Sequence, residues 1–217
     1  MFNKKYFLNT LKEIEISNLD IKKRELKNKS NEVIILYIEQ LTDRKMLAND
    51  IIKPINIYLT NNPSKILAKE VLNNIVYSTK CIIDDKEEKI IDYILDGMAI
   101  LILSNNKKYI AIDLKKVEKR DVDTPELTYT LKGPRDSFVE NLDINLSLVR
   151  YRIKDPKLNI NKLKIGRRAK TNVAILHIED IANESIVDDV TKRVKNIDVD
   201  GIISSGELQI KAESPLL

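Results

Sequence analysis

The sequence predicts a mixed α/β fold of two small lobes, each a short sheet with packed helices, joined by a hinge-like linker. The first observation behind this prediction is an alternation along the chain. Short apolar runs of strand length are interspersed with segments whose apolar residues recur at helical spacing. The second observation is an internal echo. NEVIILYIEQLTDRKMLANDIIKPI begins at Asn31, TNVAILHIEDIANESIVDDVTKRV begins at Thr171, and each reads as strand, acidic turn and amphipathic helix.

This echo aligns Val33 with Val173, Glu39 with Glu179 and Tyr37 with His177. Two explanations stay open: buried strand–turn–helix units resemble one another by chance, or both lobes follow the same pattern. In either case we expect two small sheets covered by helices. The expected limits are 1–115 for the first lobe, 116–132 for the linker and a connecting strand, and 133–217 for the second lobe.

The elements of the first lobe follow from apolar spacing and from turn residues. Val33–Ile38 is continuously apolar, which predicts a strand buried on both faces of its sheet. A helix is expected from about Asp43 to Ile52, ended by Pro54. The other expected elements are a short helix within 1–20, an edge strand at Ile21–Leu26, a helix from Pro63, a helix over Lys86–Leu95 ended by Asp96-Gly97, and a hairpin of Met98–Leu103 with Tyr109–Leu114.

The second lobe is predicted in the same way. A charged surface connection at 115–126 precedes a short strand at Leu127–Leu131. Ser137 and Glu140 form a capping box, which predicts that a helix begins there. The remaining expected elements are strands at Leu158–Ile165 and Val173–Ile178 with a bulge between Ile160 and Leu163, a helix with Ile186, Val190, Val194 and Ile197 on one face, and a last strand at Gly201–Ile203 before a polar tail.

The composition excludes several classes of function. The net charge of +4 on 217 residues is mild and does not call for nucleic acid as a partner. One cysteine and one histidine exclude a Cys/His zinc cluster, and Cys81 reads as a small buried hydrophobe. A Gly-rich phosphate loop, a nucleophile elbow and a metal-spaced carboxylate cluster are all missing. We therefore expect no enzyme activity and no cofactor. No apolar run reaches the length of a membrane span, and the N-terminus does not read as a signal peptide.

The most distinctive local sequence is KGPRDSFVENLD, from Lys132 to Asp143. Its Gly-Pro pair predicts a rigid turn that holds Arg135 and Asp136 just before a helix N-terminus, where free amides favour anions. Two interpretations stay open for these residues and for Glu140. They contact a ligand, or they form a capped turn whose Arg–Asp pair fixes the junction between the lobes.

A second charged segment, from Lys154 to Lys170, carries seven basic residues against one acid. Gly166-Arg167-Arg168 is the expected hairpin tip. Arg167, Arg168 and Lys170 are candidates for contact with phosphate, acidic lipid or an acidic partner. The alternative is a solvated edge strand whose lysines prevent aggregation.

Three further residues stand at or near strand ends. Glu39 and Glu179 follow equivalent strands, and strand ends are where α/β sheets often place ligands. The alternative role for both acids is to cap the following helix. His177 lies inside an apolar strand and reads as a hydrogen-bonded core residue rather than as a ligand or base.

These blocks together resemble the A subunits of GerA-type spore germinant receptors. The resemblance rests on GPRDSFVENLDINLSLVRYRIKDPKL, then IGRRAKTNVAILHIEDIAN, and then IDVDGIISSG, in that order. It extends from about Asn31 to Gly206 and is dense from Lys132 to Ser205.

The resemblance implies a function that composition does not show. Such subunits are proteins of the spore inner membrane, and the soluble N-terminal part is expected on the cytoplasmic, spore-core side. They act with B and C subunits and with other A subunits to detect nutrients such as amino acids and to start germination. The resemblance therefore implies a domain that senses a small-molecule germinant and transmits a signal to a membrane portion beyond Leu217. The alternative is an assembly module that packs receptor subunits together without binding germinant itself.

Overall fold

The computed structural model describes residues 20–62, 64, 68–77, 80–103, 106–116 and 138–213. They form two compact units, one over Lys22–Arg152 and one over Ile153–Leu217. The helix expected within 1–20, the strand expected at Leu127–Leu131, and Arg135 with Asp136 lie outside the described residues.

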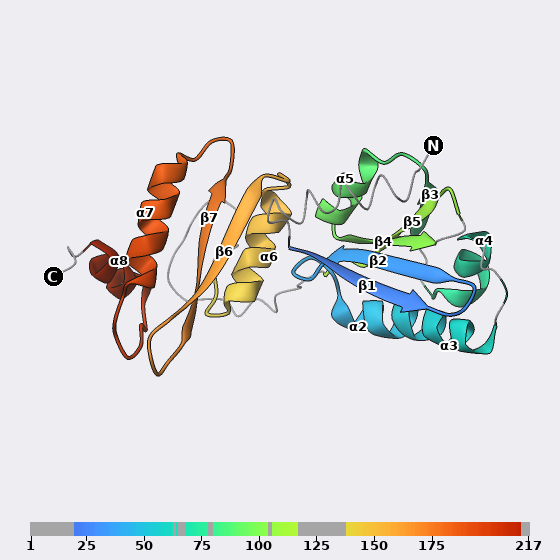
Figure 1. Ribbon diagram of the computed structural model, residues 1–217, viewed down its shortest axis with the longest axis horizontal. Coiled ribbons are helices and arrows are strands. Elements are labelled where there is room, and N and C mark those ends of the chain that lie inside the picture. Colours follow the sequence, from blue (N-terminus) through green and yellow to red (C-terminus); the bar gives the residue numbers. More distant parts are fainter. Residues whose placement is uncertain are drawn as a thin grey trace, which may run out of the picture. The chain divides into compact units, whose positions relative to one another are not determined.

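The first unit is built on a five-stranded sheet with the strand order β1-β2-β4-β5-β3 (Figure 1). Strand β2 pairs antiparallel with β4, so that Val33 lies opposite Leu103. Strands β4 and β5 pair antiparallel with Met98 opposite Asp113, which confirms the predicted hairpin. The strands are β1 (Ile21–Lys27), β2 (Glu32–Ile38), β3 (Cys81–Asp84), β4 (Met98–Leu103) and β5 (Tyr109–Asp113).

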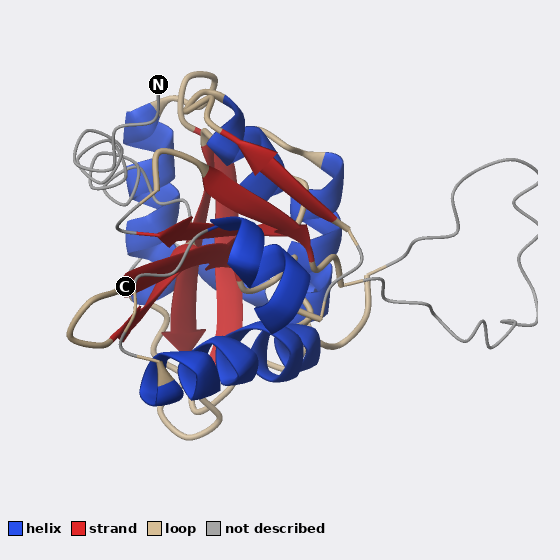
Figure 2. Ribbon diagram, turned by 90° about the vertical axis from the view of Figure 1, so that its right-hand side faces the viewer, coloured by secondary structure: helices blue, strands red, loops and turns tan. Residues whose placement is uncertain are grey.

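Helices cover both faces of this sheet, as the apolar character of Val33–Ile38 predicted. On one face, Val33 and Ile35 of the sheet share a core with Ile51 and Ile55 of the helical layer. On the other face lies α5, which packs against β4 and β2 and buries Ile94 (Figure 1). Figure 2 shows the same arrangement from the side, with strands between helical segments. The helices are α2 (Arg44–Met46), η1 (Leu47–Ile52), α3 (Lys53–Asn61), α4 (Ala68–Glu70), η2 (Val71–Ile75), α5 (Lys89–Leu95) and α6 (Leu142–Arg152).

Pro54 does not end the first long helix, and that prediction is wrong. The helix continues through Pro54 to Asn61, with the proline in the first turn of α3. The preceding segment, η1, is π-helical, and the Lys53 amide donates to Ala48 O, five residues back. In an α-helix, a proline ring clashes with the carbonyl four residues earlier. The wider π-helical turn before Pro54 displaces that carbonyl, so the helix can continue past the proline.

Strand β3 at the sheet edge was not predicted from the sequence. Cys81 lies at its start opposite Ile112 and packs against the hydrophobic core, although it is partly rather than completely buried. At the other end of β3, the Asp84 carboxylate accepts the Asp85 amide at 2.7 Å and the Tyr93 hydroxyl at 3.1 Å. The Tyr93 bond connects the edge strand to α5.

Helix α6 begins later than its predicted capping box. It starts at Leu142, and the Asn141 side chain accepts the amides of Asp143 and Ile144. Glu140 lies in a bend before the helix and Ser137 lies outside the described residues, so the predicted helix start at the Ser137–Glu140 capping box is wrong, whereas ligand contact by Glu140 stays a prediction. The sequence assigned this helix to the second lobe, whereas its Ser147 hydroxyl donates to Gln40 O of the first unit at 2.8 Å.

The second unit is a two-stranded hairpin with two helices. Strands β6 (Leu158–Ile165) and β7 (Thr171–Ile178) pair antiparallel in one unbroken register. The predicted bulge is therefore absent. Apolar residues change phase along β6 because Leu158 and Ile160 lie on one face, whereas Leu163 and Ile165 lie on the other. Helix α7 (Glu184–Lys195) and helix α8 (Ser205–Glu213) complete the unit, and their Val194, Leu208 and Ala212 share a core with Ile165.

The predicted last strand at Gly201–Ile203 is also wrong. Those residues form no regular element, and the chain after them is helical rather than a polar tail. Thr171 Oγ1 donates to Ile202 O at 3.0 Å, so a side chain rather than a strand ladder holds this segment.

Gly97 predicts a local test of the fold. Its φ of +80° ends α5, and a Cβ there would lie 3.0 Å from Leu41 O. Gly97→Ala should lower the free energy of unfolding by about 1–2 kcal/mol, measured by urea denaturation. Gly206→Ala is the matched control, because nothing lies within 4 Å of its Cβ and it stands in a helix. The control should be neutral or stabilising by up to about 1 kcal/mol; equal losses in both variants would contradict this account.

Asp84 predicts a pH dependence of stability. Burial opposes its ionisation, but the amides of Asp85 and Lys86 and the Tyr93 hydroxyl outweigh burial and lower its pKa. A lowered folded-state pKa stabilises the protein above the unfolded value near 3.9, and this stabilisation is lost as the pH falls through the folded value. Asp84→Asn should therefore lose stability at neutral pH, and its difference from wild type should shrink below about pH 4. Urea denaturation from pH 7 to 3 measures this, with Asp85→Asn as control; a constant difference across that range would refute it.

Candidate functional site

The segment before α6, which follows the GPRD motif in the sequence, is hydrogen-bonded to the first turn of that helix. Val139 N donates to the Asn145 side chain at 2.8 Å, and the same side chain donates back to Val139 O at 2.7 Å. Glu140 between them is exposed. Arg135 and Asp136 lie outside the described residues, so their contact with a ligand stays a prediction.

Glu39 and Glu179 occupy matching turns, but neither caps a helix. In the first turn Leu41 N donates to Ile38 O, and in the second Ile181 N donates to Ile178 O, each at 3.1 Å. The residues that cap the following helices are Asp43, which accepts the amides of Lys45 and Met46, and Asn183, which accepts that of Ser185. The internal echo therefore corresponds to one local structure used twice.

Each of these two acids already has a partner within its own unit. Glu39 forms an ion pair with Arg44 at 3.1 Å. Glu179 accepts the Asn159 side chain at 3.2 Å. Ligand contact by either residue stays a prediction, and it requires the ligand to compete with these partners.

His177 lies opposite Asn159 in the hairpin and is half-buried. Its Nδ1 is buried without a hydrogen-bond partner among the residues that the structure describes. The prediction of a hydrogen-bonded core histidine is therefore not met at this nitrogen.

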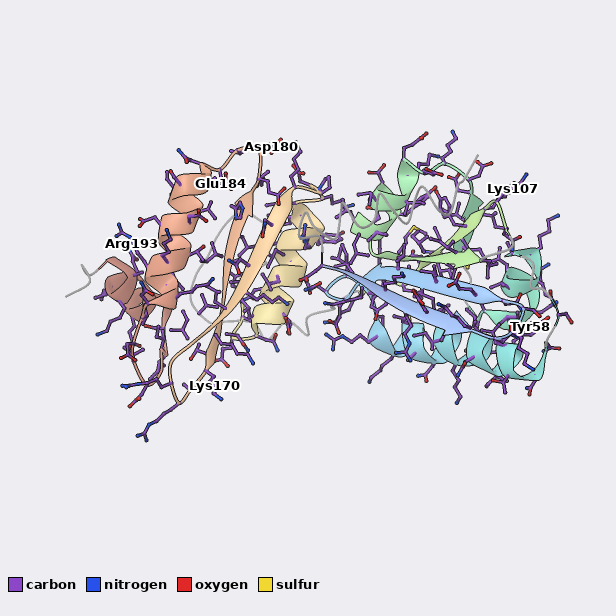
Figure 3. All side chains as sticks on the ribbon, in the orientation of Figure 1. Tyr58, Lys107, Lys170, Asp180, Glu184 and Arg193 are labelled. Atoms are coloured by element: carbon purple, nitrogen blue, oxygen red, sulfur yellow. The ribbon has the colours of Figure 1, made fainter. Side chains whose placement is uncertain are left out.

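The basic hairpin tip is more balanced in charge than the sequence suggested. Arg167 lies 3.3 Å from Asp198 and 3.4 Å from Asp200, and Arg168 lies 3.7 Å from Asp200. Backbone bonds from Arg167 N to Val199 O and from Arg168 N to Asp200 O fix this arrangement. Figure 3 shows Lys170 at this end of the hairpin and Asp180 at the other.

The tip also depends on two left-handed residues. Gly166 has a φ of +91° and Lys170 a φ of 49°. A Cβ at position 166 would lie 2.9 Å from Asp200 O, so glycine is required there. The side chains of Arg167 and Arg168 are 67% and 86% exposed. Ion pairs at such exposed positions are weak, so a partner can displace them at a small loss of free energy.

The first unit also contains a hollow of about 460 Å³ between α3 and η2, a volume in the range of small-molecule sites. The sequence did not reveal it. Amides, two phenols, one cation and apolar side chains form its lining: Asn49, Lys53, Pro54, Ile57, Tyr58, Asn61, Asn62, Asn74, Ile75 and Tyr77.

Two members of this lining are held in place by other groups. The Tyr58 hydroxyl donates to the Glu70 carboxylate, and this hydrogen bond raises the pKa of Tyr58. The Asn62 side-chain amide donates to the backbone carbonyl of Tyr58 at 3.1 Å. The backbone carbonyl of Asn62 accepts a hydrogen bond from the Asn28 side-chain amide, also at 3.1 Å. Figure 3 shows Tyr58 on the helical layer of this unit.

Four other members keep their polar groups available. Within the described part of the chain, the side chains of Asn49, Lys53, Asn61 and Asn74 have no hydrogen-bond or ion-pair partner. Amides donate and accept, and the ammonium adds one positive charge. This lining suits a small polar molecule with a carboxylate or several hydroxyls.

Metal binding and membrane insertion would each require particular features of the described residues. Within them, no group of three or more His, Cys, Asp and Glu residues is placed to hold a metal ion. None of their helices combines the length and the apolar character that crossing a bilayer demands.

Comparison with known proteins places this fold in a family context. The family model described as Bacillus/Clostridium GerA spore germination protein matches residues 6–214. Spore germination protein B1 of Bacillus subtilis is 32% identical over 175 residues, covering 81% of this chain and 36% of that protein. Spore germination protein GerQA of Bacillus cereus is 30% identical over 193 residues, covering 88% of this chain and 38% of that protein. The chain therefore spans little more than a third of these relatives.

A solved structure agrees with these sequence matches. The crystal structure of the N-terminal domain of the A subunit of the Bacillus megaterium spore germinant receptor GerK3 has a TM-score of 0.67 and 27% identity. The match covers 97% of this chain and 78% of that one. The mixed α/β architecture predicted from the sequence is thus confirmed.

The hairpin tip predicts a measurable change in membrane affinity. Asp198→Asn with Asp200→Asn removes the partners of Arg167 and Arg168 and should strengthen binding to anionic lipid vesicles about tenfold or more, at about 1 kcal/mol per charge. Vesicle cosedimentation at low and high salt measures it. Glu184→Gln with Asp188→Asn makes the same change in net charge on α7. An equal gain in that control would show that the tip is not the contact.

Proposed function

The chain belongs to the GerA family of spore germination proteins, and on that premise we propose that it acts in nutrient sensing as the N-terminal domain of a germinant receptor A subunit. In this role it binds a small polar germinant and passes the signal that triggers germination to the rest of the receptor. The receptor lies in the spore inner membrane, with this domain on the cytoplasmic, spore-core side. B and C subunits and other A subunits are the proposed partners.

The observation that carries this proposal is the hollow between α3 and η2. Its volume of about 460 Å³ fits an amino acid, a nucleoside or a sugar. Lys53 is suited to a carboxylate, and the amides of Asn49 and Asn74 are suited to amino or hydroxyl groups. Helix α3 packs on the sheet through Ile55 and Leu59. A ligand that shifts this helix would therefore change the packing of the core of the unit.

A second candidate function, assembly of receptor subunits, is supported by the surface of α7. Ile186 is 61% exposed and Ile181, in the turn before the helix, is 78% exposed. The apolar stripe predicted for this helix is buried only at Val194, while Val190 remains 39% exposed. Exposed apolar side chains on one flank are typical of a surface that contacts another protein.

The sensing proposal is tested by ligand-dependent melting of the 217-residue chain against amino acids, nucleosides and sugars. A ligand at a hundred times its Kd should stabilise the chain by roughly 2.7 kcal/mol, a rise in Tm of very roughly 5–10 °C. Lys53→Ala and Asn74→Ala should each weaken binding roughly tenfold or more, because each loses a hydrogen bond to the ligand. Lys69→Ala is the control, since Lys69 is exposed and lies outside the hollow.

Two results would argue against this site or this function. If Arg135→Ala abolishes the rise while Lys53→Ala keeps it, the ligand contacts the GPRD block instead. No saturable rise at high millimolar concentrations of any compound would refute sensing by this domain and leave assembly as its role.

A further inference from the structure

Strand β7 lies at an edge of its sheet without the features that normally protect such an edge. Its sequence TNVAILHI has no charged residue and no proline over eight residues. The other edge strands of the described sheets are protected, because β1 reads IKKRELK, β6 carries Lys162 and Lys164, and β3 has only four residues. Lysines and short length discourage strand addition, whereas a long neutral edge invites it.

The backbone of β7 shows which residues form this open edge. Glu179 N donates to Lys157 O at 3.0 Å, which continues the β6–β7 ladder by one pair. Hydrogen-bonded and non-hydrogen-bonded pairs alternate in an antiparallel ladder, so odd-numbered residues of β7 bond to β6. Asn172, Ala174 and Leu176 therefore direct their amides and carbonyls away from β6. No backbone bond on that side is found within the described residues.

Side-chain exposure agrees with an accessible edge. Asn172 is exposed, and Leu176 is 37% exposed although it is apolar. Ala174 between them has no side chain long enough to shield the backbone.

The internal echo shows what the equivalent edge does in the first unit. There β2 has β1 on one side and receives β4 antiparallel on the other, with Ile34 opposite Ile102. Ile34 and Leu36 are the residues that align with Ala174 and Leu176. In the described part of the second unit, β7 has β6 on one side and no strand on the other (Figure 1).

We infer that β7 pairs antiparallel with β7 of a second copy of this chain, about a two-fold axis at Ala174. This register places Ala174 opposite Ala174 and Asn172 opposite Leu176, which are residues whose backbone groups point outward. It forms about six interchain hydrogen bonds, two for each of the three pairs. No charge opposes a like charge across the junction, since the strand carries none.

A second copy is the partner favoured because the two edges of this hairpin differ. Pairing through β7 creates a four-stranded sheet with the order β6-β7-β7-β6, and both of its outer edges then carry Lys162 and Lys164. Lysine-bearing edges resist further addition, so the assembly closes as a dimer instead of growing into a fibre. This interface is independent of the hollow in the first unit.

Two matched double variants test the register. Asn172→Lys with Leu176→Lys places lysine opposite lysine at both outer pairs and should weaken dimerisation at least tenfold. Asn172→Glu with Leu176→Lys places glutamate opposite lysine and should restore dimerisation to within a few-fold of wild type. Both variants carry the same change at Leu176, so a folding defect there affects both equally. Sedimentation equilibrium of the 217-residue chain from micromolar to submillimolar concentrations measures the dimer constant.

Hydrogen exchange of the Asn172, Ala174 and Leu176 amides supplies the second measurement. Their protection should rise with protein concentration, and less so in the lysine–lysine variant. The inference is overturned if the wild-type chain stays monomeric throughout this range, and protection at low concentration would then show that its own chain covers the edge. It is also overturned if both double variants dimerise like wild type.

Discussion

Burial of both faces of the five-stranded sheet is the constraint on which the rest of the first unit depends. Every residue of β4 is buried, as are all but the last of β5, so no surface of these two strands is left for water. A sheet of this kind is stable only if helices cover it on both sides. The π-helical segment before Pro54, the turn at Gly97 and the Asp84–Tyr93 bond all serve to keep those helices in place.

This requirement also creates the candidate ligand site. Because α3 and η2 direct Ile55, Leu59 and Ile75 into the core, their other sides carry asparagines toward the hollow. Burial thus decides the orientation of each helix, and the orientation decides which polar side chains converge. A ligand bound in the hollow would contact helices that also pack in the core, as the proposed sensing role requires.

The second unit covers its sheet with fewer elements. A two-stranded hairpin has two faces and two edges, and α7 and α8 cover mainly the face that carries Ile165 and Val173. Within the described residues, an edge of the hairpin has no neighbouring strand and one flank of α7 remains exposed, with Ile186 and Val190 on that flank. The two units therefore differ in what they present to their surroundings: a polar hollow in one, and an open strand edge with apolar side chains in the other.

Local sequence was enough to predict the fold class, the strands Val33–Ile38, Met98–Leu103 and Leu158–Ile165, and the family resemblance. The spacing of apolar residues and the presence of turn-forming residues are local properties of the sequence. These strands show both, so they can be predicted without knowledge of the tertiary structure. The capping residues were misplaced because Ser137 with Glu140 matched the pattern as well as Asn141 did, and only packing decides between competing caps.

Three features are visible only in the folded chain: the passage of the helix through Pro54, the pairing of Arg167 and Arg168 with the loop that holds Asp198 and Asp200, and the hollow. Asn49 and Asn74 are 25 residues apart in sequence, and nothing local marks them as neighbours. The phase change in β6 illustrates the same limit. Local alternation indicated a bulge, whereas the strand is unbroken and buries Leu158 and Ile160 from one face and Ile165 from the other, because burial depends on residues distant in sequence.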